Sequence, residues 1–188
     1  MRRSAAESLK GQTETLVAAA TAAAAWFRRP APSALSAART ARLRALGWRE
    51  AAVLANKSLR GFPKSDAADA SFALREAVEH AAQAVSEAAR FSVEPDDGLL
   101  RTAEALRESA KALAAAASGR GKAKAEALVL AKKWAGEAER LRRLTRSDAH
   151  EDPSLTNALK RETVSTRLSN SAEAVQQACD ALSGGLVE

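Results

Sequence analysis

Residues 168–182 read LSNSAEAVQQACDAL, and this stretch indicates the fold of the chain. Its apolar side chains recur alternately four and three residues apart, which is the spacing of a helix that packs one face against other helices. A second stretch, residues 99–113, has the same spacing. The positions expected to be buried are Leu168, Ala172, Val175, Cys179 and Leu182 in the first stretch, and Leu99, Ala103, Leu106, Ala110 and Leu113 in the second.

Prolines and glycines divide the chain into six helical segments. Pro30 ends the first segment because proline cannot continue a helix, and Gly61 is expected to stop the second. Asp96 or Asp97 is expected to cap the fourth segment, and Pro153 to occupy the first turn of the sixth. The predicted helices span residues 4–28, 33–60, 65–91, 97–118, 122–146 and 153–183, with no strand. Long helices joined by short turns pack antiparallel, so the sequence predicts one all-α domain over residues 1–188.

Side chains that carry out catalysis are scarce. The 188 residues include one cysteine, two histidines and no tyrosine, and no stretch is long and apolar enough to predict a membrane span. The lone Cys179 excludes an internal disulfide and is typical of a reducing cytoplasm. The composition therefore favours a cytoplasmic protein that presents surfaces to partners, with no catalytic residues.

The formal net charge of +6 raises the question of an anionic partner. Acidic and basic residues alternate along most segments, which is typical of solvated helix faces. No stacking aromatics accompany the basic clusters, so a nucleic-acid partner is not favoured. The basic excess is concentrated at Arg39, Arg42, Arg44 and Arg49, and at Lys132, Lys133, Arg140, Arg142, Arg143 and Arg146.

Several isolated residues have ordinary structural interpretations. His80 is expected to be a surface or half-buried histidine, because no second His or Cys lies at ligand spacing. His150 lies in an acidic turn that is expected to be solvated. Glu104 and Glu108 are expected to form a surface ion ladder with the basic residues beside them. Residues 119–122 (GRGK) predict a turn, because the spacing of a phosphate-binding loop is missing.

Two parts of the chain carry a resemblance to a known family. Residues 59–63 (LRGFP), followed by Asp66 and Asp69, resemble the start of the third helix of the PhoU-like phosphate-transport regulators. Residues 158–162 (ALKRE) and 168–173 (LSNSAE) are similar to the last helix of that family, and the helix number and order agree. The resemblance implies two three-helix bundles, and a cytoplasmic regulator that docks on an inorganic-phosphate permease or a signalling partner.

Members of that family hold iron or zinc clusters with carboxylates spaced one helical turn apart, because residues i and i+4 share a helix face. The present chain departs from this pattern, with one carboxylate or none at each matching pair. The resemblance and these departures together predict a relative without a metal cluster or other cofactor, although Glu79, Glu139 and Glu173 together would offer a site for one ion. The matching pairs are Ala45 and Arg49, Glu79 and Gln83, Ala135 and Glu139, and Ser169 and Glu173.

Large aromatic residues lie close in sequence to two of the altered pairs, so we expect apolar packing or a protein contact in place of the metal. The sequence thus predicts a non-enzymatic regulator or accessory protein of phosphate transport that contacts a permease or another regulatory protein. Assembly into a homo-oligomer is compatible with the same sequence. The alternative is a basic helical module for an anionic partner, either nucleic acid or a granule or membrane surface. The predicted partner-binding residues are Trp48, Arg49, Trp134, Arg142 and Arg143.

Overall fold

The computed structural model describes residues 5–56, 64–149 and 154–184, and these ranges form helices joined by short connections, with no strand. This confirms the prediction of an all-α protein with six helices. The helices are α1 (Ala5–Arg28), α2 (Pro32–Asn56), α3 (Lys64–Phe91), α4 (Asp97–Ser118), α5 (Gly121–Ala149) and α6 (Leu155–Gly184).

The helix ends differ from the predicted ones by a few residues. Helix α5 continues to Ala149 because no glycine or proline interrupts the chain after residue 146, although Ser and Asp at 147–148 favour a turn. Helix α6 begins at Leu155. The predicted stop at Gly61 and the first-turn Pro153 lie outside the described residues. Asp96 is the N-cap of α4, since its Oδ1 accepts a hydrogen bond of 2.7 Å from the Leu99 amide.

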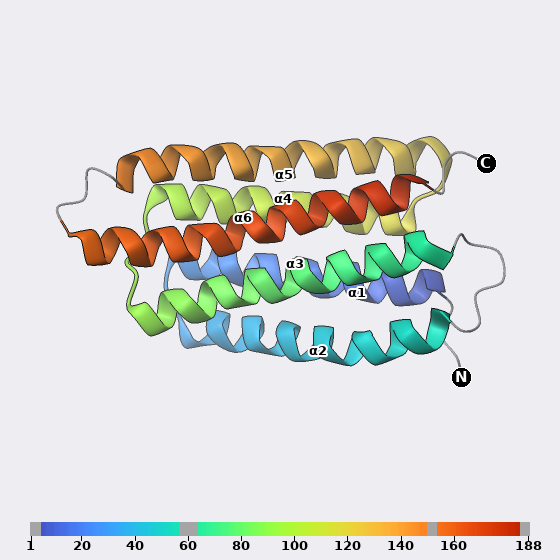
Figure 1. Ribbon diagram of the computed structural model, residues 1–188, viewed down its shortest axis with the longest axis horizontal. Helices are drawn as coiled ribbons and strands as arrows, with labels where there is room; N and C mark the ends of the chain where they lie inside the picture. The colour runs from blue at the N-terminus through green and yellow to red at the C-terminus, as the bar shows by residue number, and fades with distance from the viewer. Residues whose placement is uncertain (1–4, 57–63, 150–153, 185–188) are drawn as a thin grey trace.

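The six helices pack as two sets of three. Helices α1, α2 and α3 contact one another, as do α4, α5 and α6, and the two sets meet where α3 packs on α6 and α1 packs on α4. Figure 1 shows α1, α3, α4 and α6 as the inner layers, with α2 and α5 on opposite outer sides. Successive helices run antiparallel in the same view. The two outer helices therefore each contact only one set.

Alanine and leucine dominate the core between the helices. All ten positions that the two apolar stripes predict as buried are buried, which confirms both stripes. Small side chains let helix backbones approach closely enough for buried hydroxyls to reach a neighbouring helix. The Ser109 hydroxyl donates to the Ala131 carbonyl and the Ser171 hydroxyl to the Ala77 carbonyl, each at 2.7 Å. These contacts fix the register of α4 against α5 and of α6 against α3.

None of the described helices contains a segment that is both long and apolar enough to cross a lipid bilayer.

Candidate functional site

The interface between α2 and α3 is one place where the resemblance to the PhoU-like regulators implies paired carboxylates. Glu79 on α3 accepts hydrogen bonds from Arg42 on α2, with Nε 2.9 Å from Oε2 and Nη2 2.6 Å from Oε1. The amide of Gln83, one turn later, donates to Oε1 at 2.7 Å. Ala45 is buried beside them. The single carboxylate is thus satisfied by a guanidinium and an amide, and a metal ion would have to displace Arg42.

A second arginine occupies the matching position between α5 and α6. Arg142 Nη2 lies 3.3 Å from Glu162 Oε1 and 3.3 Å from Thr166 Oγ1, and Nη1 lies 3.4 Å from Ser169 Oγ and 3.7 Å from Glu139 Oε1. Ser169 also donates to Glu139. The side chain of Arg142 is only 21% exposed. It therefore links α5 to α6 from within the protein.

These contacts change the roles that the sequence suggests for several residues. Arg142 is predicted from the sequence to bind a partner, but its guanidinium is engaged between α5 and α6. Glu79, Glu139 and Glu173 do not form one ion site, because no group of three His, Cys, Asp or Glu residues in the described ranges could hold a metal. Arg143 is 76% exposed and stays a predicted partner-binding residue. The side chains of Trp48 and Arg49 lie outside the described residues.

Trp134 lies on the α4 side of α5, away from Glu139 on the α6 side. The indole is half-buried against the core and lines an open groove of about 450 Å³ between α4 and α5. Trp134 therefore does not pack at Glu139, the position on α5 where the resemblance implies a metal ligand, and it does not replace a metal there. It faces a groove instead, where charged residues of α4 and α5 surround it. The charged lining residues are Arg101, Glu104, Arg107, Glu108, Glu137 and Arg140.

Every carboxylate that lines this groove already has a cationic partner. Glu104 pairs with Arg28, which reaches it from α1. Glu108 Oε1 accepts hydrogen bonds from Lys111 at 2.9 Å and from Arg107 at 3.0 Å, and the Lys111 bond is the main cause that lowers the pKa of Glu108. Two further hydrogen bonds, from the Arg140 guanidinium, lower the pKa of Glu137. Each of the three carboxylates is therefore paired with a cation of the same chain.

Arg101, on the same lining, forms no ion pair with a described side chain, although it lies close enough to Glu137 to lower its pKa. The groove lining itself holds three cations and three carboxylates. Arg28 and Lys111, which pair with two of these carboxylates from outside the lining, raise the number of cations to five. An acidic group of a partner can approach this groove without meeting an unpaired carboxylate, and the indole offers an apolar surface beside it. The five cations are Arg28, Arg101, Arg107, Lys111 and Arg140.

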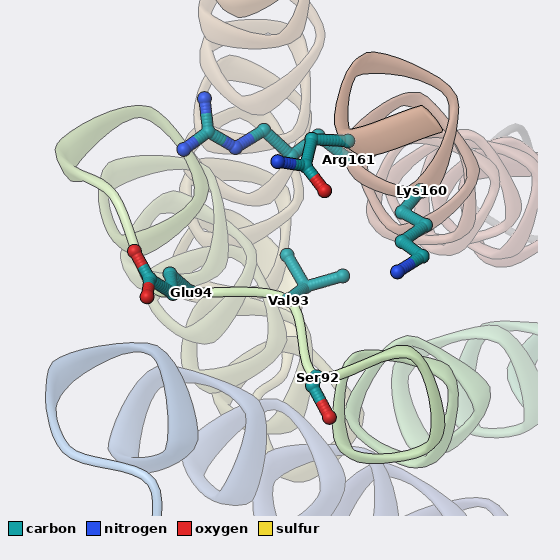
Figure 2. Close-up of a pocket in the computed structure, with 6 residues that line it drawn as sticks. Ser92, Val93, Glu94, Lys160 and Arg161 are labelled. Carbon is teal, nitrogen blue, oxygen red and sulfur yellow. The ribbon is translucent and has the colours of Figure 1, made fainter. Parts of the chain in front are cut away.

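A smaller pocket, of about 150 Å³, lies where the turn after α3 meets the start of α6 (Figure 2). Figure 2 shows the side chains of Lys160 and Glu94 on opposite sides of Val93. Arg161 Nε lies 3.8 Å from Asp96 Oδ2. The turn carries two carboxylates, Glu94 and Asp96, against the two cations of α6, so the pocket has no excess positive charge to hold an anion. The pocket lies where α6 packs against the turn within the chain.

The remaining sequence candidates are structural. His80 is half-buried as predicted, and burial together with the nearby Arg167 lowers its pKa, so the imidazole is neutral near pH 7. Cys179 is fully buried on the α6 seam, and burial raises the pKa of its thiol to about 12, so it packs as a small apolar residue. His150 lies outside the described residues.

The basic excess of the chain lies on its two outer helices. Helix α2 has four arginines and one glutamate, a net charge of +3, and α5 has eight basic and four acidic residues, a net charge of +4. Together they carry +7 against +6 for the whole chain, so everything else carries −1. The sequence locates the two basic clusters, and the fold places them on opposite outer sides (Figure 1).

Comparison of the chain with models of protein families and with curated proteins finds no match.

Proposed function

We propose that this protein is a non-enzymatic regulator or accessory protein of phosphate transport, which docks on an inorganic-phosphate permease or on a regulatory partner of one. The docking surface of this proposal is the groove between α4 and α5 that contains Trp134. One observation supports this choice of surface. A half-exposed indole lies in a groove where cations outnumber carboxylates by two and where each carboxylate is already paired within the chain.

The groove has the properties of a protein-binding surface. Tryptophan and arginine are the residues that most often dominate binding energy at protein interfaces, where they sit in pockets surrounded by polar contacts. Trp134 is packed against the core, so little side-chain entropy is lost when a partner covers it. The free guanidinium of Arg101 favours an acidic side chain. The expected partner segment therefore presents an acidic residue next to an apolar one.

The phosphate-transport part of the proposal rests on the resemblance to PhoU-like regulators. The pairing of α1–α3 and α4–α6 into two sets is consistent with the two bundles that the resemblance implies. The arginines that pair with Glu79 and Glu139 support a mode of action without the metal clusters of that family. Contact with another protein is then the remaining means of regulation.

The proposal is tested in cells that carry the gene, by measuring uptake of radiolabelled phosphate and co-purification of the permease with the tagged chain. Deletion of the gene is expected to change phosphate uptake, and the wild-type chain to restore it. The variants Trp134→Ala and Arg101→Glu are expected not to restore uptake and to lose the permease. Lys133→Glu, an exposed change on α5 outside the groove, serves as the control. If phosphate uptake is unchanged after deletion, the proposed role in phosphate transport is wrong. If both groove variants restore uptake fully, the groove is not the docking surface.

A further inference from the structure

A second surface, on the opposite side of the molecule from α5, combines positive charge with exposed apolar side chains. Between Pro32 and Gly47, helix α2 has three arginines and no acidic residue. Three large apolar side chains are exposed there or on the adjacent part of α3: Leu43 at 69%, Leu46 at 50% and Phe72 at 56%. We call this surface the α2 outer face, and its residues are Arg39, Leu43, Arg44 and Leu46 on α2, with Phe72 and Arg75 on α3.

The apolar members of the α2 outer face belong to one continuous part of the surface. Arg42 of α2 pairs with Glu79 of α3. Because the two helices run antiparallel, Leu46 and Arg75 each lie one turn from that pair in the same direction, on the same helix faces. The Arg75 guanidinium in turn lies 5.4 Å from the centre of the Phe72 ring, in a cation–π contact. Cations and apolar groups therefore alternate across the junction of the two helices.

The charge of the α2 outer face is only partly balanced within the chain. Arg39, Arg44 and Arg75 form no ion pair with any side chain that the structure describes. Glu79 is occupied by Arg42, and Glu76 lies toward His80, where it partly offsets the lowering of the His80 pKa by burial and Arg167. Asp69 is the nearest exposed carboxylate on α3, one turn before Phe72. Three guanidinium groups thus remain for an external anion.

We propose that the α2 outer face lies on an anionic lipid membrane, with its arginines on lipid phosphates and Leu43, Leu46 and Phe72 at the boundary between headgroups and acyl chains. Exposed arginines interspersed with large apolar side chains can bind an anionic lipid surface through both charge attraction and apolar insertion. Its exposed face is a convex ridge, and mobile headgroups can arrange themselves around such a ridge, whereas a protein partner would need a matching concave surface. Nucleic acid is disfavoured because Arg75 lies over Phe72, the one described aromatic ring of this face.

The experiment measures binding of the whole chain to vesicles of phosphatidylcholine with and without phosphatidylglycerol, by co-sedimentation. We expect binding only when the anionic lipid is present, and weaker binding as the salt concentration rises. The triple variant Arg39→Gln/Arg44→Gln/Arg75→Gln is expected to weaken binding about five-fold per arginine, on the order of 100-fold in total. The double variant Leu43→Gln/Leu46→Gln, with unchanged charge, is expected to weaken it about ten-fold.

The matched control removes three exposed cations from α5 with the variant Lys122→Gln/Lys133→Gln/Arg143→Gln, which changes the net charge equally on the opposite side. This variant is expected to retain most of the binding. The proposal is overturned if the wild-type chain does not bind the anionic vesicles, or if the α5 variant loses as much binding as the α2 variant. It is also overturned if the leucine variant binds like wild type. Far-UV circular dichroism checks that each variant is folded. The vesicle experiment contains no permease, so a lack of membrane binding would not contradict the proposed role in phosphate transport. Unchanged phosphate uptake in cells would likewise not contradict membrane binding by the α2 outer face.

Discussion

Arg42 on α2 and Glu79 on α3 form a two-point ion pair, in which Nε and Nη2 of the arginine face the two carboxylate oxygens at 2.9 and 2.6 Å. In the other half, Arg142 of the outer helix α5 contacts one carboxylate of α5 and one of α6. In both halves an arginine from the outer helix contacts a carboxylate at a position where the resemblance implies a metal ligand. Each guanidinium thus links the outer helix to a neighbouring helix of its own set.

The first prediction concerns metal content. We expect the purified chain to contain far less than one iron or zinc ion per molecule, because the guanidinium groups of Arg42 and Arg142 repel a cation at Glu79 and Glu139. Elemental analysis after dialysis against a metal-containing buffer measures this directly. A stoichiometric content of either metal would contradict the prediction.

The second prediction compares two neighbouring arginines of α5. Arg142→Met leaves Glu139 and Glu162 without their shared cation, and both carboxylates are about two-thirds buried. We expect a loss of about 1–2 kcal/mol in the free energy of unfolding, after allowance for solvent screening. Arg143→Met removes a side chain that is 76% exposed, and the expected change is within about 0.5 kcal/mol. Urea denaturation measures both, and equal effects would refute the role assigned to Arg142.

The sequence predicts the fold well because helix periodicity and chain breakers are local signals. The stripe from Leu99 to Leu113 can be derived from spacing alone, and all its members are buried. The N-cap at Asp96 follows from a short polar side chain before an apolar run. The end of α5 could not be derived, because Ser147 and Asp148 favour a turn while no glycine or proline stops the helix there.

The candidate site could be predicted only in part, because its contacts join residues far apart in the chain. Arg28 and Glu104 are 76 positions apart, and Arg42 and Glu79 are 37 apart. Such pairs depend on the register between helices, which spacing within one helix does not determine. The direction of Trp134 toward α4 also depends on how α5 is rotated about its axis. The aromatic size of Trp134 and the predicted ion ladder of Glu104 and Glu108 are the two sequence signals for the groove.

The third prediction tests close helix packing. Ala172 is fully buried on the face of α6 that carries the apolar seam, next to Ser171, whose hydroxyl reaches the Ala77 carbonyl of α3. Ala172→Leu inserts a larger side chain where the backbones approach closely, so we expect a loss of about 1–3 kcal/mol in unfolding free energy. Ala115→Leu, at an exposed position of α4, is the matched control and is expected to change stability by less than about 0.5 kcal/mol.

Thermal or urea unfolding of both alanine variants provides the measurement. If Ala172→Leu were as stable as the control, the interface between α3 and α6 would have room for a leucine, and the inference of close packing from the Ser171 hydrogen bond would be wrong.

The fourth prediction concerns the buried thiol of Cys179 and alkaline pH. Burial raises its pKa from 9.0 to about 12 in the folded chain. Between these values the unfolded chain loses the thiol proton and the folded chain keeps it, so the unfolded state is favoured increasingly as pH rises. The stability contribution is therefore fully present below pH 9, and declines between pH 9 and 12 by at most about 1.4 kcal/mol per pH unit.

Urea unfolding of the wild type and of Cys179→Ala at several pH values from neutral to alkaline isolates this contribution, because lysines titrate in both proteins alike. The variant loses some packing at every pH, yet its stability is expected to fall less steeply above pH 9 than that of the wild type. In the same range a thiol reagent should react with the wild-type chain only as fast as the chain opens, since the folded thiol is neutral and buried. Parallel pH profiles for the two proteins, together with rapid labelling of the native chain, would show that Cys179 is exposed to solvent and that the α6 seam is not closed.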